Sequence, residues 1–140
     1  SNIYDSLISF IPRLKNIEYA KLYPEQQTGD GSIEHPFQMP FYEYADVVHE
    51  FEKEVYKFEK DHPEFQLNTY NNIFLMNGLR WDEEVMTKAD VSNANGQVVM
   101  ALILGAIRAE RFCDGTLKDF LELGCIEKWL LRLQEIASKI

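Results

Sequence analysis

The clearest hydrophobic pattern in the chain lies in residues 41–60. Its apolar side chains recur at steps of four and three residues: Tyr44, Val48, Phe51, Val55 and Phe58. Because an α-helix turns once about every 3.6 residues, this spacing places all of them on one helical face. We therefore expect the pattern to become helical from Phe41 onward. It predicts an amphipathic helix of about four turns, which Asp61-His62-Pro63 ends.

A second pattern, over residues 94–113, is apolar on every side of a helix. Its apolar residues cover all faces: Val98, Val99, Met100, Leu102, Ile103, Leu104 and Ile107. A helix that is hydrophobic all round is buried, so we expect this one at the centre of the fold. Gly105 lowers helix propensity by about 1 kcal/mol, which indicates a close crossing with another helix at that point.

Shorter patterns surround this predicted central helix. Helices are expected over residues 3–14 with a break near Phe10, 69–77, 83–88 with Asp82 as N-cap, 116–123, and 125–140. Residues 17–41 are the least helical part, and we expect residues 19–23 to pair with 36–39. The predicted fold class is predominantly all-α. It is a single domain over residues 1–140, a compact bundle of about six helices around 94–113, with a short β-ribbon near 19–39.

Composition and charge narrow the classes of function. The chain has 140 residues, of which 46% are hydrophobic, so it can build one core without disulfides or a structural metal. Its formal net charge of −9 argues against a protein that binds nucleic acid by neutralising phosphates. We therefore expect no direct nucleic-acid contact.

The negative charge is concentrated on the helix predicted over 44–60 and its ends. Glu43, Asp46, Glu50 and Glu54 line one stripe beside the apolar face. One interpretation is a solvated surface, supported by lysines at helical spacing from these acids. The alternative is an interaction surface that competes for a basic groove, as acidic inhibitors that mimic nucleic acid do.

The remaining sequence features favour a cytoplasmic protein without a cofactor. There is no secretory signal and no apolar run long enough to cross a bilayer, and the two cysteines are too few for a disulfide framework. Phosphate-binding, dinucleotide-binding and nucleophile-elbow motifs are absent. The three histidines are dispersed, which argues against a metal site. We expect no membrane contact, while oligomeric state stays open.

The strongest candidate site is the charged end of the central helix. Arg108 and Arg111 fall on one helical face, whereas Glu110 projects toward the apolar side and needs a cation or several donors there. One interpretation is a structural brace between Glu110 and an arginine. The other is a pocket in which the arginines hold an anion and Glu110 acts as base or orienting group. Three loop residues would close that pocket: His35, Gln38 and Trp81.

Two motifs carry a resemblance to a known family. They are Glu34–Pro40, which reads EHPFQMP, and the segment that opens with Ala89–Ser92 (ADVS) and continues through Ala101–Gly115 (ALILGAIRAERFCDG). The chain resembles a family of small bacterial proteins catalogued as a domain of unknown function. The resemblance implies a bacterial or phage-encoded intracellular protein. It brings no assigned activity and therefore no catalytic residues.

Three hypotheses of function follow. The first is a non-catalytic helical interaction module with a protein partner, because no known catalytic constellation is visible. The second is a small anion-binding protein or enzyme that uses the Arg108, Glu110 and Arg111 pocket. It requires residues 34–40 to pack near the end of the central helix. The third is an acidic inhibitor that mimics nucleic acid, which requires salt-sensitive binding to a basic partner.

Overall fold

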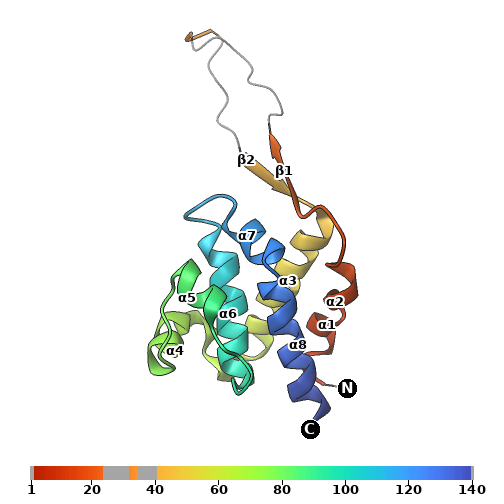
Figure 1. The fold of residues 1–140 in the computed structure, drawn as a ribbon, viewed down its shortest axis with the longest axis vertical. Helices are drawn as coiled ribbons and strands as arrows, with labels where there is room; N and C mark the ends of the chain where they lie inside the picture. The colour runs from red at the N-terminus through yellow and green to blue at the C-terminus, as the bar shows by residue number, and fades with distance from the viewer. Residues whose placement is uncertain (1, 24–31, 35–40, 140) are drawn as a thin grey trace.

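The central helix predicted from the sequence is the centre of the structure. In a computed structural model, which describes residues 2–23, 32–34 and 41–139, helix α6 (Gly96–Ala109) runs through the middle of the bundle (Figure 1). Every residue of α6 from Val98 to Ile107 is buried. The helix is shorter than the predicted 94–113 at both ends. It begins after Asn95, whose side chain accepts a hydrogen bond from the Val98 amide at 3.0 Å, and it ends at Ala109.

Other helices pack around α6 on several sides. Their bounds are α1 (Asp5–Ile8), α2 (Phe10–Arg13), α3 (Asp46–Asp61), α4 (Tyr70–Met76), α5 (Glu83–Lys88), α7 (Thr116–Glu122) and α8 (Cys125–Ser138), with two 3-10 turns at Pro63–Phe65 and Leu67–Thr69. Helix α6 contacts α3, α4, α7 and α8, while α1 covers α3 and α8. The predicted fold class, a mainly helical bundle with a short β-ribbon, is confirmed.

The ribbon exists, but its second strand lies later in the chain than predicted. Strand β1 (Ala20–Tyr23) pairs antiparallel with β2 (Phe41–Tyr44), so that Ala20 faces Tyr44 and Tyr23 faces Phe41. The predicted partner, residues 36–39, lies outside the described residues. The ribbon projects from one end of the bundle, whereas the two ends of the chain lie at the other (Figure 1).

Helix α3 consequently starts later than its hydrophobic pattern indicated. The prediction of helical structure from Phe41 was wrong, because residues 41–44 form β2 and α3 begins at Asp46. Tyr44 is buried with the helical stripe all the same, since side chains alternate along β2 and Tyr44 points inward. A residue in an inward strand position thus continued the helical spacing of Val48, Phe51, Val55 and Phe58.

The structure accounts for two local predictions, a close helix crossing at Gly105 and a break in the N-terminal helix. Gly105 does mark a close crossing: a side chain there would meet the ring of Phe74 from α4 at 3.0 Å and Met86 from α5 at 3.3 Å. The N-terminal helix is interrupted at Ser9, between α1 and α2, and Pro12 sits in the short helix α2. Proline is tolerated there because the first turn of a helix does not use its amide hydrogens.

No helix within the described ranges combines the length and the apolar character that a bilayer crossing requires.

Candidate functional site

Glu110 lies directly after α6, and its carboxylate accepts hydrogen bonds from β2 and from the start of α7. The Tyr44 hydroxyl donates to Glu110 Oε1 at 2.7 Å. The backbone amides of Gly115 and Leu117 donate to the same carboxylate at 3.0 Å and 2.9 Å. The partner of Glu110 is therefore a tyrosine and two amides in place of the expected arginine. The brace joins the end of α6 to β2 and to the start of α7.

Tyr44 is suited to this role by its surroundings. Burial and the hydrogen bond to Glu110 raise the pKa of its hydroxyl far above the ordinary value of 10.0. The hydroxyl therefore stays protonated and donates to Glu110, while its oxygen accepts from the Lys118 amide at 3.0 Å. One phenol thus bonds Glu110 at the end of α6 and the Lys118 amide in the first turn of α7.

Arg108 and Arg111 point to α3, away from this brace. Arg108 Nη2 lies 3.5 Å from Glu59 Oε2, and its guanidinium lies over the rings of Tyr56 and Tyr70, 5.9 Å and 5.6 Å from their centroids. Arg111 Nη2 donates to the Tyr56 hydroxyl at 3.0 Å. The two arginines share the Tyr56 ring. Arg108 is paired with Glu59, although its buried Nε has no hydrogen-bond partner among the described residues, and Arg111 bonds a neutral hydroxyl.

The predicted pocket residues are only partly brought together. His35 and Gln38 lie outside the described residues, although the adjoining strand reaches the expected place. The Tyr42 amide donates to Asp114 Oδ2 at 2.8 Å. Trp81 lies beside α6, and its indole Nε1 donates to the Gly105 carbonyl at 3.0 Å. Trp81 and Ala109 both line a hollow on this side of α6. Arg108 and Arg111 do not line this hollow.

This hollow, which we call the Trp81 groove, has a volume of about 340 Å³. It is lined by residues of α5, of the end of α6 and of α7: Trp81, Asp82, Glu83, Met86, Ala109, Phe112, Cys113, Thr116 and Phe120. Met86 and Phe120 are buried and form an apolar floor. Phe112 stands at its edge with 77% of its surface exposed, and its ring contacts Trp81 edge to face at 5.4 Å.

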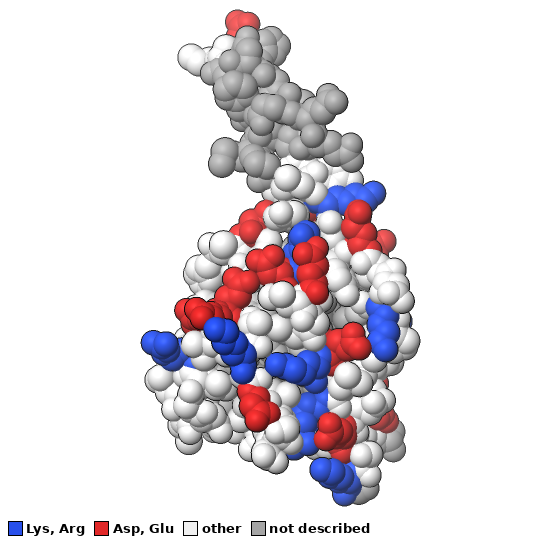
Figure 2. Space-filling view, in the orientation of Figure 1, with Lys and Arg blue, Asp and Glu red and all other residues white. Residues whose placement is uncertain are grey.

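Carboxylates border the groove where α5 begins. The Asp82 side chain caps α5 by accepting from the Val85 amide at 3.1 Å, which places Glu83 in the first turn. Desolvation, followed by the charge of Asp119 and a hydrogen bond with it, raises the pKa of Glu83. The carboxylates of Glu83 and Asp119 therefore lie close to each other. Acidic side chains form a band over α5 and α7 on the face that Figure 2 shows.

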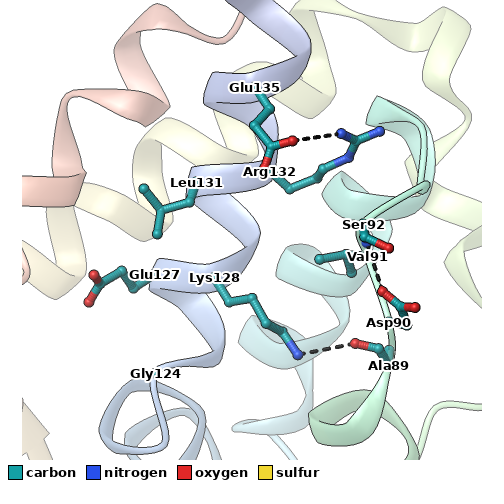
Figure 3. A pocket seen from close by; sticks show the side chains of 10 residues that line it. All are labelled: Ala89, Asp90, Val91, Ser92, Gly124, Glu127, Lys128, Leu131, Arg132 and Glu135. Carbon is teal, nitrogen blue, oxygen red and sulfur yellow. Dashed lines mark hydrogen bonds and ion pairs between the residues drawn. The ribbon is translucent and has the colours of Figure 1, made fainter.

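A larger hollow, of about 470 Å³, lies between α8 and the loop that follows α5. The ADVS motif, Ala89–Ser92, forms one wall of it (Figure 3). Lys128 and Arg132 from α8 point across to that loop, where they donate to the carbonyls of Ala89 and Ala94 at 3.1 Å and 3.0 Å. Both cations thus fasten the loop to α8.

The acidic stripe on α3 is solvent-facing but does not use the ion pairs its spacing suggested. Glu43 on β2 and Asp46 at the start of α3 are exposed, and Glu54 is half-buried. Glu50 pairs with Arg13 from α2 across the helix pair, instead of with a lysine of its own helix. Among the described residues, no three histidine, cysteine or carboxylate side chains are placed to hold a metal ion.

The groove residues that sequence reasoning missed come from three separate segments. Glu83 and Asp119 are 36 positions apart, and no local pattern relates them. Phe112 carried a usable signal, because a large aromatic residue lies between charged and polar neighbours after the apolar helix ends. Tyr44 was assigned to the apolar stripe of the predicted helix, so its hydroxyl was not considered as a hydrogen-bond donor.

The fold and the site define the chain as a small, mainly α-helical protein with a β-ribbon fastened to the end of its central helix. A family model matches residues 2–139, so the chain belongs to DUF6508, a family of unknown function. Searches of curated proteins and of solved structures each gave no match.

Proposed function

We propose that this protein is a non-catalytic interaction module that binds a protein partner in the Trp81 groove. The observation that carries the proposal is Phe112, an aromatic side chain 77% exposed beside an apolar hollow. Covering a phenylalanine of this kind contributes roughly 1.5–3 kcal/mol, and aromatic anchors in desolvated hollows dominate many protein interfaces.

The charged groups at the end of α6 support this proposal over the anion-binding alternative. Glu110 accepts hydrogen bonds from three donors of its own chain, and Arg108 and Arg111 contact Glu59 and Tyr56. Glu110 would first have to leave its donors to act as a base, and the charge of Arg108 is already paired with Glu59. These contacts join the end of α6 to β2, α3 and α7, as a structural support does.

The cellular setting belongs to the proposal as well. We place the module in the cytoplasm of a bacterium or of a phage-infected cell. Both cysteines are free thiols, Cys125 in the core and Cys113 at the groove, as is usual for proteins of reducing compartments. The family resemblance supports a bacterial or phage origin.

A selection from a random peptide library displayed on phage, with the whole chain immobilised, tests the proposal. We expect enriched peptides whose affinity falls at least about tenfold in Phe112→Ser, because the apolar contact at the groove edge is lost. Leu75→Ser is the matched control. Leu75 is 68% exposed on α4 and does not line the groove, so its replacement leaves binding unchanged.

The result is interpretable because Phe112 is largely exposed, so its replacement leaves the core intact. Circular dichroism and thermal unfolding of both variants establish this directly. The proposal is wrong if no peptide is enriched, or if the enriched peptides bind the Phe112→Ser and Leu75→Ser variants equally well.

A further inference from the structure

Two carboxylates line the Trp81 groove, Asp82 and Glu83, and a third, Asp119 of α7, lies beside Glu83. Asp82, Glu83 and Asp119 take part in none of the ion pairs among the described residues. The lysines of α5 and α7, Lys88 and Lys118, are paired with other acids, and Lys118 also interacts with the charge of Asp119. Lys88 lies 2.8 Å from Glu84, and Lys118 lies 2.7 Å from Glu122. Five acids, Asp82, Glu83, Glu84, Asp119 and Glu122, outnumber these two lysines, so the rim of the groove presents an excess of negative charge beside its apolar floor.

A second hollow adjoins the first across the start of α5. It has a volume of about 410 Å³ and shares Asp82 and Glu83 with the Trp81 groove. Leu123, 63% exposed, lines it, and we call it the Leu123 hollow. Asp82 and Glu83 thus form a charged ridge between two hollows, each with an exposed apolar side chain at its border, Phe112 on one side and Leu123 on the other.

We infer that the partner segment is basic as well as apolar, with a lysine or arginine between two large apolar side chains. The apolar side chains would occupy the Trp81 groove and the Leu123 hollow, and the cation would lie over the ridge that Asp82 and Glu83 form between them. This inference rests on the proposed function and specifies the partner that the groove takes.

The two kinds of contact contribute differently to such binding. Apolar burial supplies most of the affinity, because exposed ion pairs at an interface rim are individually weak. The charges act mainly on selection and on the rate of encounter. An acidic partner segment would place like charges against Asp82 and Glu83, whereas a basic segment satisfies them together with Asp119. The rim therefore discriminates among partners that the apolar floor alone would accept.

A charge-neutral rim variant tests the inference. It combines Asp82→Asn, Glu83→Gln and Asp119→Asn, which keep the size of each side chain, and asparagine caps a helix as well as aspartate does. The matched control neutralises the same number of acids on the α3 stripe with Glu43→Gln, Asp46→Asn and Glu54→Gln. Titration of the selected peptides against both variants, at about 50 and about 300 mM salt, gives their affinities.

We expect the selected peptides to carry lysine or arginine within a few positions of an aromatic or large aliphatic residue. The rim variant should bind them about five- to tenfold more weakly at low salt, and the stripe variant as well as the unmodified chain does. Peptides that require Phe112 but carry no basic residue, or that bind the rim variant equally well, overturn the inference and leave the proposed function standing. If the peptides lose affinity only for the stripe variant, the basic contact lies on the acidic stripe, and the inference is overturned also. Peptides indifferent to Phe112→Ser overturn the proposed function itself.

Discussion

Gly115 shapes the charged end of the molecule through its backbone. Its φ of +93° lies in the left-handed region, which glycine adopts without the steric cost that a Cβ brings. In that conformation its amide reaches the Glu110 carboxylate at 3.0 Å, and the ring of Tyr42 occupies the space where a side chain would be. The central helix was expected to extend to residue 113. The helix in fact ends earlier, and Gly115 directs the chain into α7.

Gly115→Ala should lower the free energy of unfolding by roughly 2–3 kcal/mol, since it adds both backbone strain and a contact with Tyr42 Cε2 at 2.7 Å. Urea denaturation measures the change. Gly78→Ala is the control, because Gly78 also has a positive φ, +72°, but has nothing within 4 Å of an added Cβ. It should lose only about 1 kcal/mol. Equal losses in the two variants would show that the Tyr42 contact relaxes without cost.

At the scale of elements, the sequence predicted most helices but not the position of the second strand. Periodicity located α4, α5, α7 and α8 because each has an apolar face with a capping or glycine residue at an end. It failed at residues 41–44, where inward strand positions and helical positions coincide at Tyr44. The choice between them depends on β1, a segment distant in sequence, and on Tyr44's bonds with Glu110 and Lys118. The local spacing of apolar residues carries no information on the pairing with β1 or on these hydrogen bonds.

Tyr44→Phe tests how strongly β2 is fastened to α6 and α7. Removing the hydroxyl deprives Glu110 of a donor and the Lys118 amide of an acceptor, so we expect a loss of about 2–3 kcal/mol in urea denaturation. Tyr19→Phe is a suitable comparison, because the Tyr19 hydroxyl makes one bond, to the Leu14 carbonyl at 2.8 Å. It should cost about 1 kcal/mol. A Tyr44→Phe loss no larger than that of Tyr19→Phe would contradict the assigned importance of the brace.

At the scale of the whole molecule, the site is the part that sequence reasoning reached least. Trp81 was named as a candidate and lies in the groove, and its role in binding stays a prediction. Arg108, Glu110 and Arg111 were correctly placed at the end of the central helix, but their partners belong to α3, β2 and α7. The groove itself forms where α5, the end of α6 and α7 meet, and only the packed chain brings Glu83 to Asp119 and Phe112 to Trp81.

A partly buried carboxylate also makes stability depend on pH, and Glu52 on α3 is a defined case. Burial, opposed in part by His49 and Arg111 and assisted by Glu110, raises the pKa of Glu52 above 4.5. Its folded-state pKa exceeds the unfolded one, so its contribution to stability is present at low pH and is lost as pH rises through the folded value. Glu52→Gln should therefore be more stable than the unmodified chain at neutral pH, by up to about 1 kcal/mol.

Urea denaturation of both proteins between about pH 3 and about pH 7 measures this difference. The difference should approach zero at the acidic end, where residue 52 is uncharged in both chains, and grow toward neutrality. A variant that is less stable at neutral pH would show that the favourable charges of His49 and Arg111 outweigh the cost of burying Glu52.

The position of Trp81 in the wall of the groove has a practical consequence. The chain has two tryptophans, and the other, Trp129, is fully buried. The indole emission of Trp81 should shift when its surroundings lose water, while that of Trp129 serves as a constant internal reference. Occupancy of the groove can thus be followed by intrinsic fluorescence in unlabelled protein, for any ligand that itself lacks tryptophan.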